Sequence, residues 1–165
     1  IFCYLMETQK SSLKHIDRLE KYQLGSSLEI DQATRRSLEI TRTIRNGSRE
    51  GSLLAALQRT SSPMGARLFA EWLNNPLTDR QAISHRLDAV EEFHSETALR
   101  NQCRQFLQGV YDLQRLVTRV ITGRTSPRDL TFIGKTLSSL PGIREKLAGR
   151  QSPLLAQLES LEETQ

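Results

Sequence analysis

Hydrophobic side chains recur every three or four positions along most of the chain from residue 31 onward, which is the spacing of one face of an α-helix. The clearest run lies within residues 112–122 and consists of Leu113, Leu116, Val117, Val120 and Ile121. Residues 79–93 carry a similar stripe made of Ile83, Leu87 and Val90. Because no segment from residue 31 onward alternates long enough for a strand, the sequence predicts an all-α, bundle-like fold of helices packed on helices.

Serine–proline pairs mark three predicted helix starts, at Ser62, Ser126 and Ser152. A serine in this position places an N-cap hydroxyl before a proline whose φ already suits the first helical turn. Thr78 and Gln81 have the spacing of a capping box, so Thr78 is predicted to cap the helix of residues 79–93.

Two shorter helices are predicted before residue 60. Asp31 is expected to cap a helix that ends near Leu38, and Ser52 is expected to cap one that carries three leucines. The two glycines of residues 45–52 interrupt the helical pattern between them. Before residue 31 the pattern is weaker: residues 1–9 resemble the end of a helix, and residues 11–31 predict irregular chain with a short strand.

Two further features concern single positions inside predicted helices. Pro141-Gly142 is expected to divide one helix, residues 129–140, from another that begins at residue 143. Gly65 lies inside a predicted helix, where glycine costs about 0.5–1 kcal/mol relative to alanine, so a close helix contact is expected there.

Trp72, the only tryptophan, lies in the predicted helix that starts at Ser62 and ends at Asn74-Asn75-Pro76. It extends a ladder of Met64 and Leu68 at four-residue spacing, so we expect Trp72 to anchor the core. Arg67 and Glu71 are four residues apart and are expected to lie together on the solvent side.

Charge and composition narrow the classes of function. The chain has 23 Lys and Arg against 19 Asp and Glu, a net charge of +4, and 18 of the 23 are arginine, which binds phosphate and carboxylate well. No apolar run approaches the roughly 20 residues that span a bilayer, so no membrane association is expected. Cys3 and Cys103 form no CxxC motif, which indicates free thiols and a cytoplasmic location.

The sequence predicts no catalytic, cofactor-binding or metal site. Glu91 and His94 have the spacing of one half of a di-iron site, but no second Glu-x-x-His exists, so a solvated helix face is expected. Residues 46–52 resemble a phosphate loop only superficially, because the Gly-x4-Gly-Lys-Ser/Thr spacing is absent. No nucleophile motif such as Gly-x-Ser-x-Gly is present.

Arginines are concentrated between residues 100 and 128, where Asp112 is the only acidic residue. Arg115 and Arg119 share the helix face opposite the apolar stripe and are therefore candidate contacts for DNA phosphates. No aromatic residues interleave with them, which excludes a stacking platform for single strands. The alternative is that these arginines form salt bridges with the acidic helix of residues 86–96 or with the acidic C-terminus.

Three ordered blocks resemble a known family: LEIDQATRRSLEI (28–40), the segment from GSLLAALQRT to DAVEEF (51–93), and GVYDLQRLVTRVITGRTSPRDL (109–130). The succession is similar to the core, or lever, domain of the MutS family of DNA mismatch-repair proteins. The resemblance implies that residues 1–10 end the connector domain and that residues 11–165 are the first half of the lever. Three positions depart from the family's usual residues: Ser37 replaces Asn, Gln58 replaces Asp, and Gln114 replaces Glu.

The resemblance implies a longer parent protein: a homodimer that recognises mismatched duplex DNA, clamps the duplex, hydrolyses ATP with Mg²⁺ and signals to a MutL-type partner. The mismatch reader, the clamp and the ATPase lie outside this stretch, so the chain is expected to couple those parts without chemistry of its own. Phe69-Ala70-Glu71 matches the family's Phe-x-Glu mismatch reader only by coincidence, because residues two apart on a helix point about 200° apart.

Two alternatives use the residues without the resemblance. A free-standing helical adaptor would bind a protein through an exposed apolar groove. A weak, sequence-independent DNA-binding module would contact duplex phosphates through the arginines of residues 100–128.

Overall fold

The computed structural model describes residues 27–160. The helices in this range are α2 (Gln32–Ser37), α3 (Leu53–Leu57), α4 (Pro63–Asn74), α5 (Arg80–Ser95), α6 (Thr97–Gln108), α7 (Leu113–Ile121), α8 (Pro127–Leu147) and α9 (Pro153–Ser160). Within residues 27–160 the only β-type pairing is an isolated antiparallel bridge between Ser27 and Leu77. The predicted all-α fold is confirmed, while the expectations for residues 1–26 lie outside the described residues.

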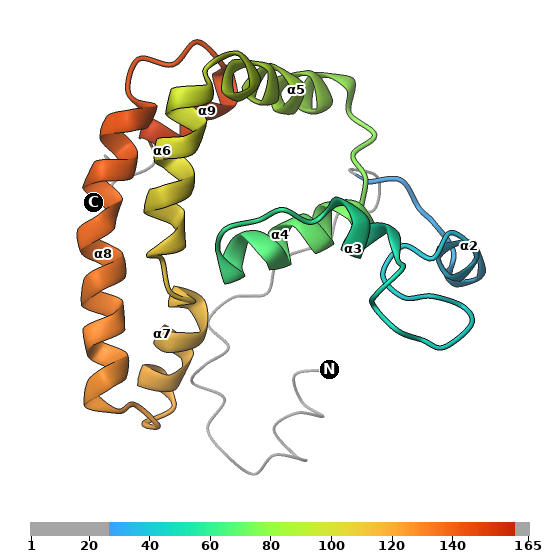
Figure 1. Ribbon diagram of the computed structural model, residues 1–165, viewed down its shortest axis with the longest axis horizontal. Helices are drawn as coiled ribbons and strands as arrows, with labels where there is room; N and C mark the ends of the chain where they lie inside the picture. Colours follow the sequence, from blue (N-terminus) through green and yellow to red (C-terminus); the bar gives the residue numbers. More distant parts are fainter. Residues whose placement is uncertain (1–26, 161–165) are drawn as a thin grey trace, which may run out of the picture.

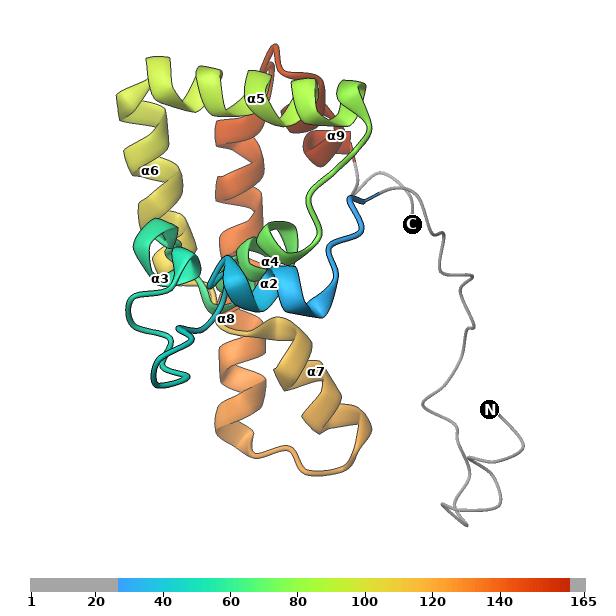
Figure 2. The ribbon, with the colours of Figure 1, turned by 90° about the vertical axis from the view of Figure 1, so that its right-hand side faces the viewer.

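The helices form two groups (Figure 1). In the larger group, α8 packs along α6, α7 and α9, and α5 lies across one end against α6 and α9 (Figure 2). The smaller group consists of α2, α3 and α4, which lie to one side and pack less extensively on the other described helices. The buried apolar residues of the larger group are Ala89, Leu99, Cys103, Val110, Leu116 and Leu155.

Four predicted N-caps are confirmed: Asp31, Ser52, Ser62 and Ser126. The cap of α8 is the most complete, because the Ser126 hydroxyl accepts from the backbone N–H of Asp129 at 3.2 Å. The Asp129 carboxylate in turn accepts from the backbone N–H of Ser126 at 3.0 Å. This reciprocal pair is a capping box that the serine–proline pattern alone did not predict.

The other two predicted caps are wrong. Asp79, rather than Thr78, caps α5, since its carboxylate accepts from the backbone N–H groups of Gln81 at 3.3 Å and Ala82 at 3.0 Å. Helix α9 begins at Pro153 as predicted, but the hydroxyl of Ser152 is buried without a hydrogen-bond partner. The Glu92 carboxylate, from α5, binds the backbone N–H of Ser152 at 3.0 Å instead.

The predicted helix break at Pro141-Gly142 is also wrong, because α8 continues through both residues to Leu147. A proline inside a helix forfeits its own hydrogen bond and crowds the carbonyl four residues earlier. Packing of α8 against α6 and α9 compensates for that cost. Gly142 contributes to this packing, since an added Cβ would lie 2.9 Å from Cε1 of Phe106 on α6.

The predicted apolar stripes are only partly buried. Trp72 is 38% exposed and is not a core anchor; the guanidinium of Arg86, on α5, lies 3.6 Å from the centre of its ring. Val90 is 64% exposed, because α5 turns Ala89 rather than the predicted stripe toward its neighbours. At Gly65 the expected helix contact is absent: the nearest atom to an added Cβ is the capping hydroxyl of Ser62, at 3.1 Å.

Candidate functional site

Helix α7 carries the two arginines that the sequence marks as candidate DNA contacts. Asp112 caps this helix by accepting from the backbone N–H of Arg115 at 3.2 Å. Arg115 and Arg119 are one helical turn apart, and their side chains are 73% and 56% exposed. Both therefore lie on the solvent side of α7, as the helical pattern predicts.

Each of these arginines is paired with a carboxylate. Nε of Arg115 lies 3.3 Å from Oδ2 of Asp112, and a terminal nitrogen of Arg119 lies 2.9 Å from Oδ1 of Asp129. Neither of these partners belongs to the acidic helix of residues 86–96 named in the salt-bridge alternative, and the acidic C-terminus of that alternative lies largely outside the described residues. The pairing reduces the net positive charge on the exposed face of α7. Contact of Arg115 and Arg119 with DNA stays a prediction.

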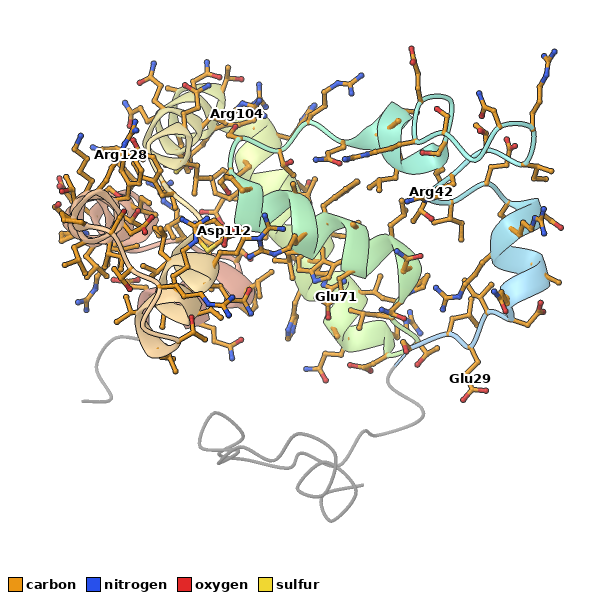
Figure 3. The ribbon with its side chains drawn as sticks, turned by 90° about the horizontal axis from the view of Figure 1, so that it is seen from below. Glu29, Arg42, Glu71, Arg104, Asp112 and Arg128 are labelled. Carbon is orange, nitrogen blue, oxygen red and sulfur yellow. The ribbon has the colours of Figure 1, made fainter. Side chains whose placement is uncertain are left out.

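Asp112 also joins α7 to α4 through Arg67 (Asp112 and Glu71 are labelled in Figure 3). The guanidinium of Arg67 donates to both carboxylate oxygens of Asp112, at 2.9 Å to Oδ1, and to Oε1 of Gln114 at 3.0 Å. Glu71 is exposed and the Arg67 side chain is 38% exposed, as expected for the solvent side, but Arg67 binds the start of α7 rather than Glu71. A fork of two donors is satisfied better by three oxygens at the start of α7 than by one flexible carboxylate on its own helix.

Hydrogen bonding to these arginines favours ionised carboxylates. The Arg67 guanidinium holds the pKa of Asp112 below its usual value, and the same bond raises the pKa of Arg67. The pKa of Asp129 is lowered mainly by the backbone N–H and hydroxyl of Ser126, with a smaller contribution from Arg119. Asp112 and Asp129 are thus ionised, and their contacts with Arg67 and Arg119 hold α7 against α4 and α8.

Two of the three departures from the family pattern fall on hydrogen-bond acceptors. The side-chain oxygen of Gln114 accepts from Arg67 at 3.0 Å, and that of Gln58 accepts from Arg49. In both places a neutral amide oxygen occupies a position where the family usually has a carboxylate. Each glutamine thus accepts a hydrogen bond from an arginine without forming an ion pair with it.

Arginines make hydrogen bonds and a ring contact between the smaller group of helices and the larger one. Besides the Arg67 fork, Arg104 on α6 donates to the backbone oxygen of Arg59 at 3.1 Å. Arg86 on α5 stacks on Trp72 of α4. Met64 of α4 also lines an apolar cavity with residues of α6, α8 and α9, so the junction combines polar, cation–π and apolar contacts.

An apolar cavity of about 440 Å³ lies between α6, α8 and α9, and Met64 of α4 and Phe93 of α5 also line it. Cys103 lines it, and burial raises the pKa of this thiol above its usual value, which makes it a poor nucleophile at neutral pH. The sequence did not predict this cavity, because its walls come from helices far apart in the chain.

The described residues offer no chemistry-bearing cluster. Within residues 27–160 no three His, Cys, Asp or Glu side chains are placed to hold a metal ion. Glu91 and His94, which have di-iron spacing, are both exposed on α5. None of the described helices is long and apolar enough to cross a bilayer.

Comparison with known proteins gives consistent matches along most of the chain. A family model described as MutS domain III matches residues 33–164. The chain is 52% identical over 160 residues to the DNA mismatch repair protein MutS of Rhodopirellula baltica, which covers 97% of this chain and 18% of that protein. It is 45% identical over 158 residues to the protein of the same name from Synechococcus elongatus, covering 96% of this chain and 18% of that protein. The chain thus spans about a fifth of the length of the curated relatives it matches.

Proposed function

The chain belongs to the MutS family and contains that family's domain III, and from this premise we propose that it is a lever segment of a DNA mismatch-repair ATPase. In this role it couples the parts that hydrolyse ATP to the parts that clamp DNA and bind the mismatch. The observation that carries the proposal is the match of residues 33–164 to MutS domain III.

The arrangement of the helices supports a mechanical role. Helix α8 has 21 residues, which corresponds to a length of about 30 Å at 1.5 Å per residue. It packs along α6, α7 and α9, and these contacts stiffen it. A displacement of one end of α8 would therefore move its other end as well. Arg67 and Arg104 connect the smaller group of helices to the larger one. A change of partner at these contacts would let the two groups adopt a second relative position.

The activities of the whole protein are proposals that rest on its relatives, which are DNA mismatch repair proteins. We place recognition of mismatched duplex DNA, homodimer formation and contact with a MutL-type partner in the full-length protein, working in the cytoplasm. The described residues do not fit ATP or Mg²⁺, since they contain neither a phosphate loop nor a cluster of metal ligands. We therefore place both in other parts of that protein.

Reading the coding sequence that flanks this chain tests the proposal. We expect the frame to continue through a clamp-type helical insertion and then a Gly-x4-Gly-Lys-Ser/Thr motif. A stop codon soon after Gln165 would contradict the proposal and favour a free-standing helical adaptor. The apolar cavity of about 440 Å³ would then be the first place to look for a bound partner.

A further inference from the structure

Four arginines surround a groove of about 610 Å³ between α2 and the loop of residues 41–47: Arg35, Arg36, Arg42 and Arg45. The loop lies in the smaller group of helices. Arg42 is far from Arg128 of the larger group in the view of Figure 3. Asp112, which pairs with Arg115, also lies well away from Arg42 in that view, so the groove is separate from the surface that carries Arg115.

Helix α2 supplies one wall. Its last turn carries Arg35 and Arg36, because the helix is only six residues long and starts at the Asp31 cap. Nε of Arg35 donates to the backbone oxygen of Ile30 at 2.9 Å, and a terminal nitrogen donates to Oδ1 of Asn74 at 3.3 Å. Both acceptors are neutral, so they fix the guanidinium without cancelling its charge.

The loop supplies the opposite wall and has a defined shape. The backbone N–H of Thr43 donates to the oxygen of Ser48 at 2.9 Å, and the N–H of Gly47 donates to the oxygen of Thr43 at 3.0 Å. Gly47 has a φ of 64°, which a glycine adopts without strain. Arg42 donates to the backbone oxygen of Gly47 at 3.4 Å, which is another neutral acceptor.

The positive charge of this groove is not neutralised by the part of the chain that the structure describes. No described carboxylate lies within ion-pair distance of the four arginines, whereas Arg67, Arg115 and Arg119 each have one. Two of the acids that are near in sequence bind the backbone instead. Asp31 caps α2, and the Glu39 carboxylate accepts from the backbone N–H of Ile44 at 2.6 Å.

Four guanidinium groups with no carboxylate partner among residues 27–160 surround one concavity, and phosphate matches their planar fork of donors. No aromatic side chain lines the groove, so it has no surface on which a base would stack. This combination favours the phosphates of a nucleic-acid backbone over a mononucleotide held by its base. We propose that the groove between α2 and residues 41–47 binds the phosphodiester backbone of duplex DNA, independently of sequence; this activity goes beyond the lever role and does not depend on it.

Salt dependence of DNA binding by the 165-residue chain tests the proposal. Each phosphate contact adds about 0.9 to the slope of log affinity against log salt. Raising the salt from 50 to 200 mM therefore weakens binding about 3.5-fold per contact, and about 150-fold for four contacts. The measurement is fluorescence anisotropy of a labelled duplex of mixed sequence at both salt concentrations.

Paired variants locate the site. Arg42→Gln/Arg45→Gln removes two contacts. Raising the salt from 50 to 200 mM should then weaken binding about 12-fold instead of about 150-fold. Arg42→Lys/Arg45→Lys keeps the charges and should restore most of the salt dependence. The matched control, Arg80→Gln/Lys135→Gln, removes two charges at exposed positions outside the groove and should leave the salt dependence within about twofold of that of the unsubstituted chain. Arg115→Gln/Arg119→Gln tests the candidate contacts of α7 in the same assay.

Several outcomes would overturn the proposal. One is the absence of salt-dependent duplex binding, and another is a larger effect of the Arg115/Arg119 variant than of the Arg42/Arg45 variant. Binding of inorganic tripolyphosphate or of a polyglutamate peptide without binding of the duplex would assign the groove to another anion. If the double variant loses its helical circular dichroism, Arg36→Gln, at an exposed position of α2, replaces it and should reduce the loss about 3.5-fold.

Discussion

At the scale of single residues, the ionised aspartates of α7 and α8 make stability depend on pH. The pKa of Asp112 is lowered first by its hydrogen bond to Arg67, and that of Asp129 first by the backbone N–H of Ser126. A carboxyl group whose pKa is lower in the folded state stabilises the fold fully above its unfolded value, about 3.9. That contribution is lost as the pH falls through the folded-state pKa.

We therefore expect the free energy of unfolding to fall below about pH 4, and Asp112→Asn to make this fall shallower. Urea unfolding followed by circular dichroism between pH 2.5 and 7 measures the effect. Asp88→Asn, at an exposed position of α5, serves as the control. An equally steep acid dependence in Asp112→Asn and the unsubstituted chain would refute the role assigned to the Arg67–Asp112 contact.

Two glycines of α8 differ only in their surroundings and form a matched pair. Nothing lies within 4 Å of an added Cβ at Gly134, whereas one at Gly142 would lie 2.9 Å from Cε1 and 3.2 Å from Cζ of Phe106. Gly134→Ala should stabilise the fold by about 0.5–1 kcal/mol through helix propensity. Gly142→Ala should lose that gain to an overpacking cost of about 1–3 kcal/mol. Urea unfolding of both variants decides the matter, and equal stabilisation by the two would show that the α6–α8 contact is loose.

At the scale of helices, Ser126 and Ser152 both precede a proline at the start of a helix, but only the Ser126 side chain caps its helix. The Ser126 hydroxyl accepts from the backbone N–H of Asp129, while the Ser152 hydroxyl has no hydrogen-bond partner. Ser126→Ala should cost about 1 kcal/mol, as for other N-caps. Ser152→Ala should be neutral or stabilising, because it removes an unpaired buried hydroxyl. Thermal unfolding of the two variants tests this, and a larger loss in Ser152→Ala would contradict the observed caps.

The helices themselves were largely predictable, because their signals are local. A cap and the amides it binds lie within three residues of each other, so Asp31, Ser62 and Ser126 could be identified from the sequence. The break expected at Pro141 failed for a tertiary reason. Contacts of α8 with α6 and α9 hold the helix together through the proline, and those partners are not visible in the sequence around it.

The contacts between helices were not predictable from periodicity. An apolar stripe shows that a helix has a hydrophobic face, but not which neighbour covers it, and so Trp72 and Val90 were expected in a core that leaves them exposed. Arg67 finds Asp112 45 residues away, beyond the reach of any rule for residues on one helix. The groove of four arginines went unnoticed because α2 and the loop of residues 41–47 each look ordinary alone.

At the scale of the whole molecule, the lever role that we propose requires the contacts between the two groups of helices to change. Arg67, Arg86 and Arg104 span the junction with hydrogen bonds and a cation–π contact. Residues 33–164 match MutS domain III, so the matched segment includes both groups of helices and the junction between them. The Arg67 fork is the most connected of these contacts and the best place to interrupt the proposed coupling.

The full-length protein that contains this chain provides the most direct test of the lever. Its affinity for a mismatched duplex, measured with and without ATP, gives a ratio that reports the coupling between the two sites. We predict that Arg67→Gln changes this ratio by about 2- to 30-fold, the usual effect of a residue on the path between two sites. Arg124→Gln, at an exposed position beyond the end of α7, should leave the ratio unchanged. An unchanged ratio in Arg67→Gln, with α4 and α7 still folded, would contradict the proposal that this segment transmits the signal through that contact.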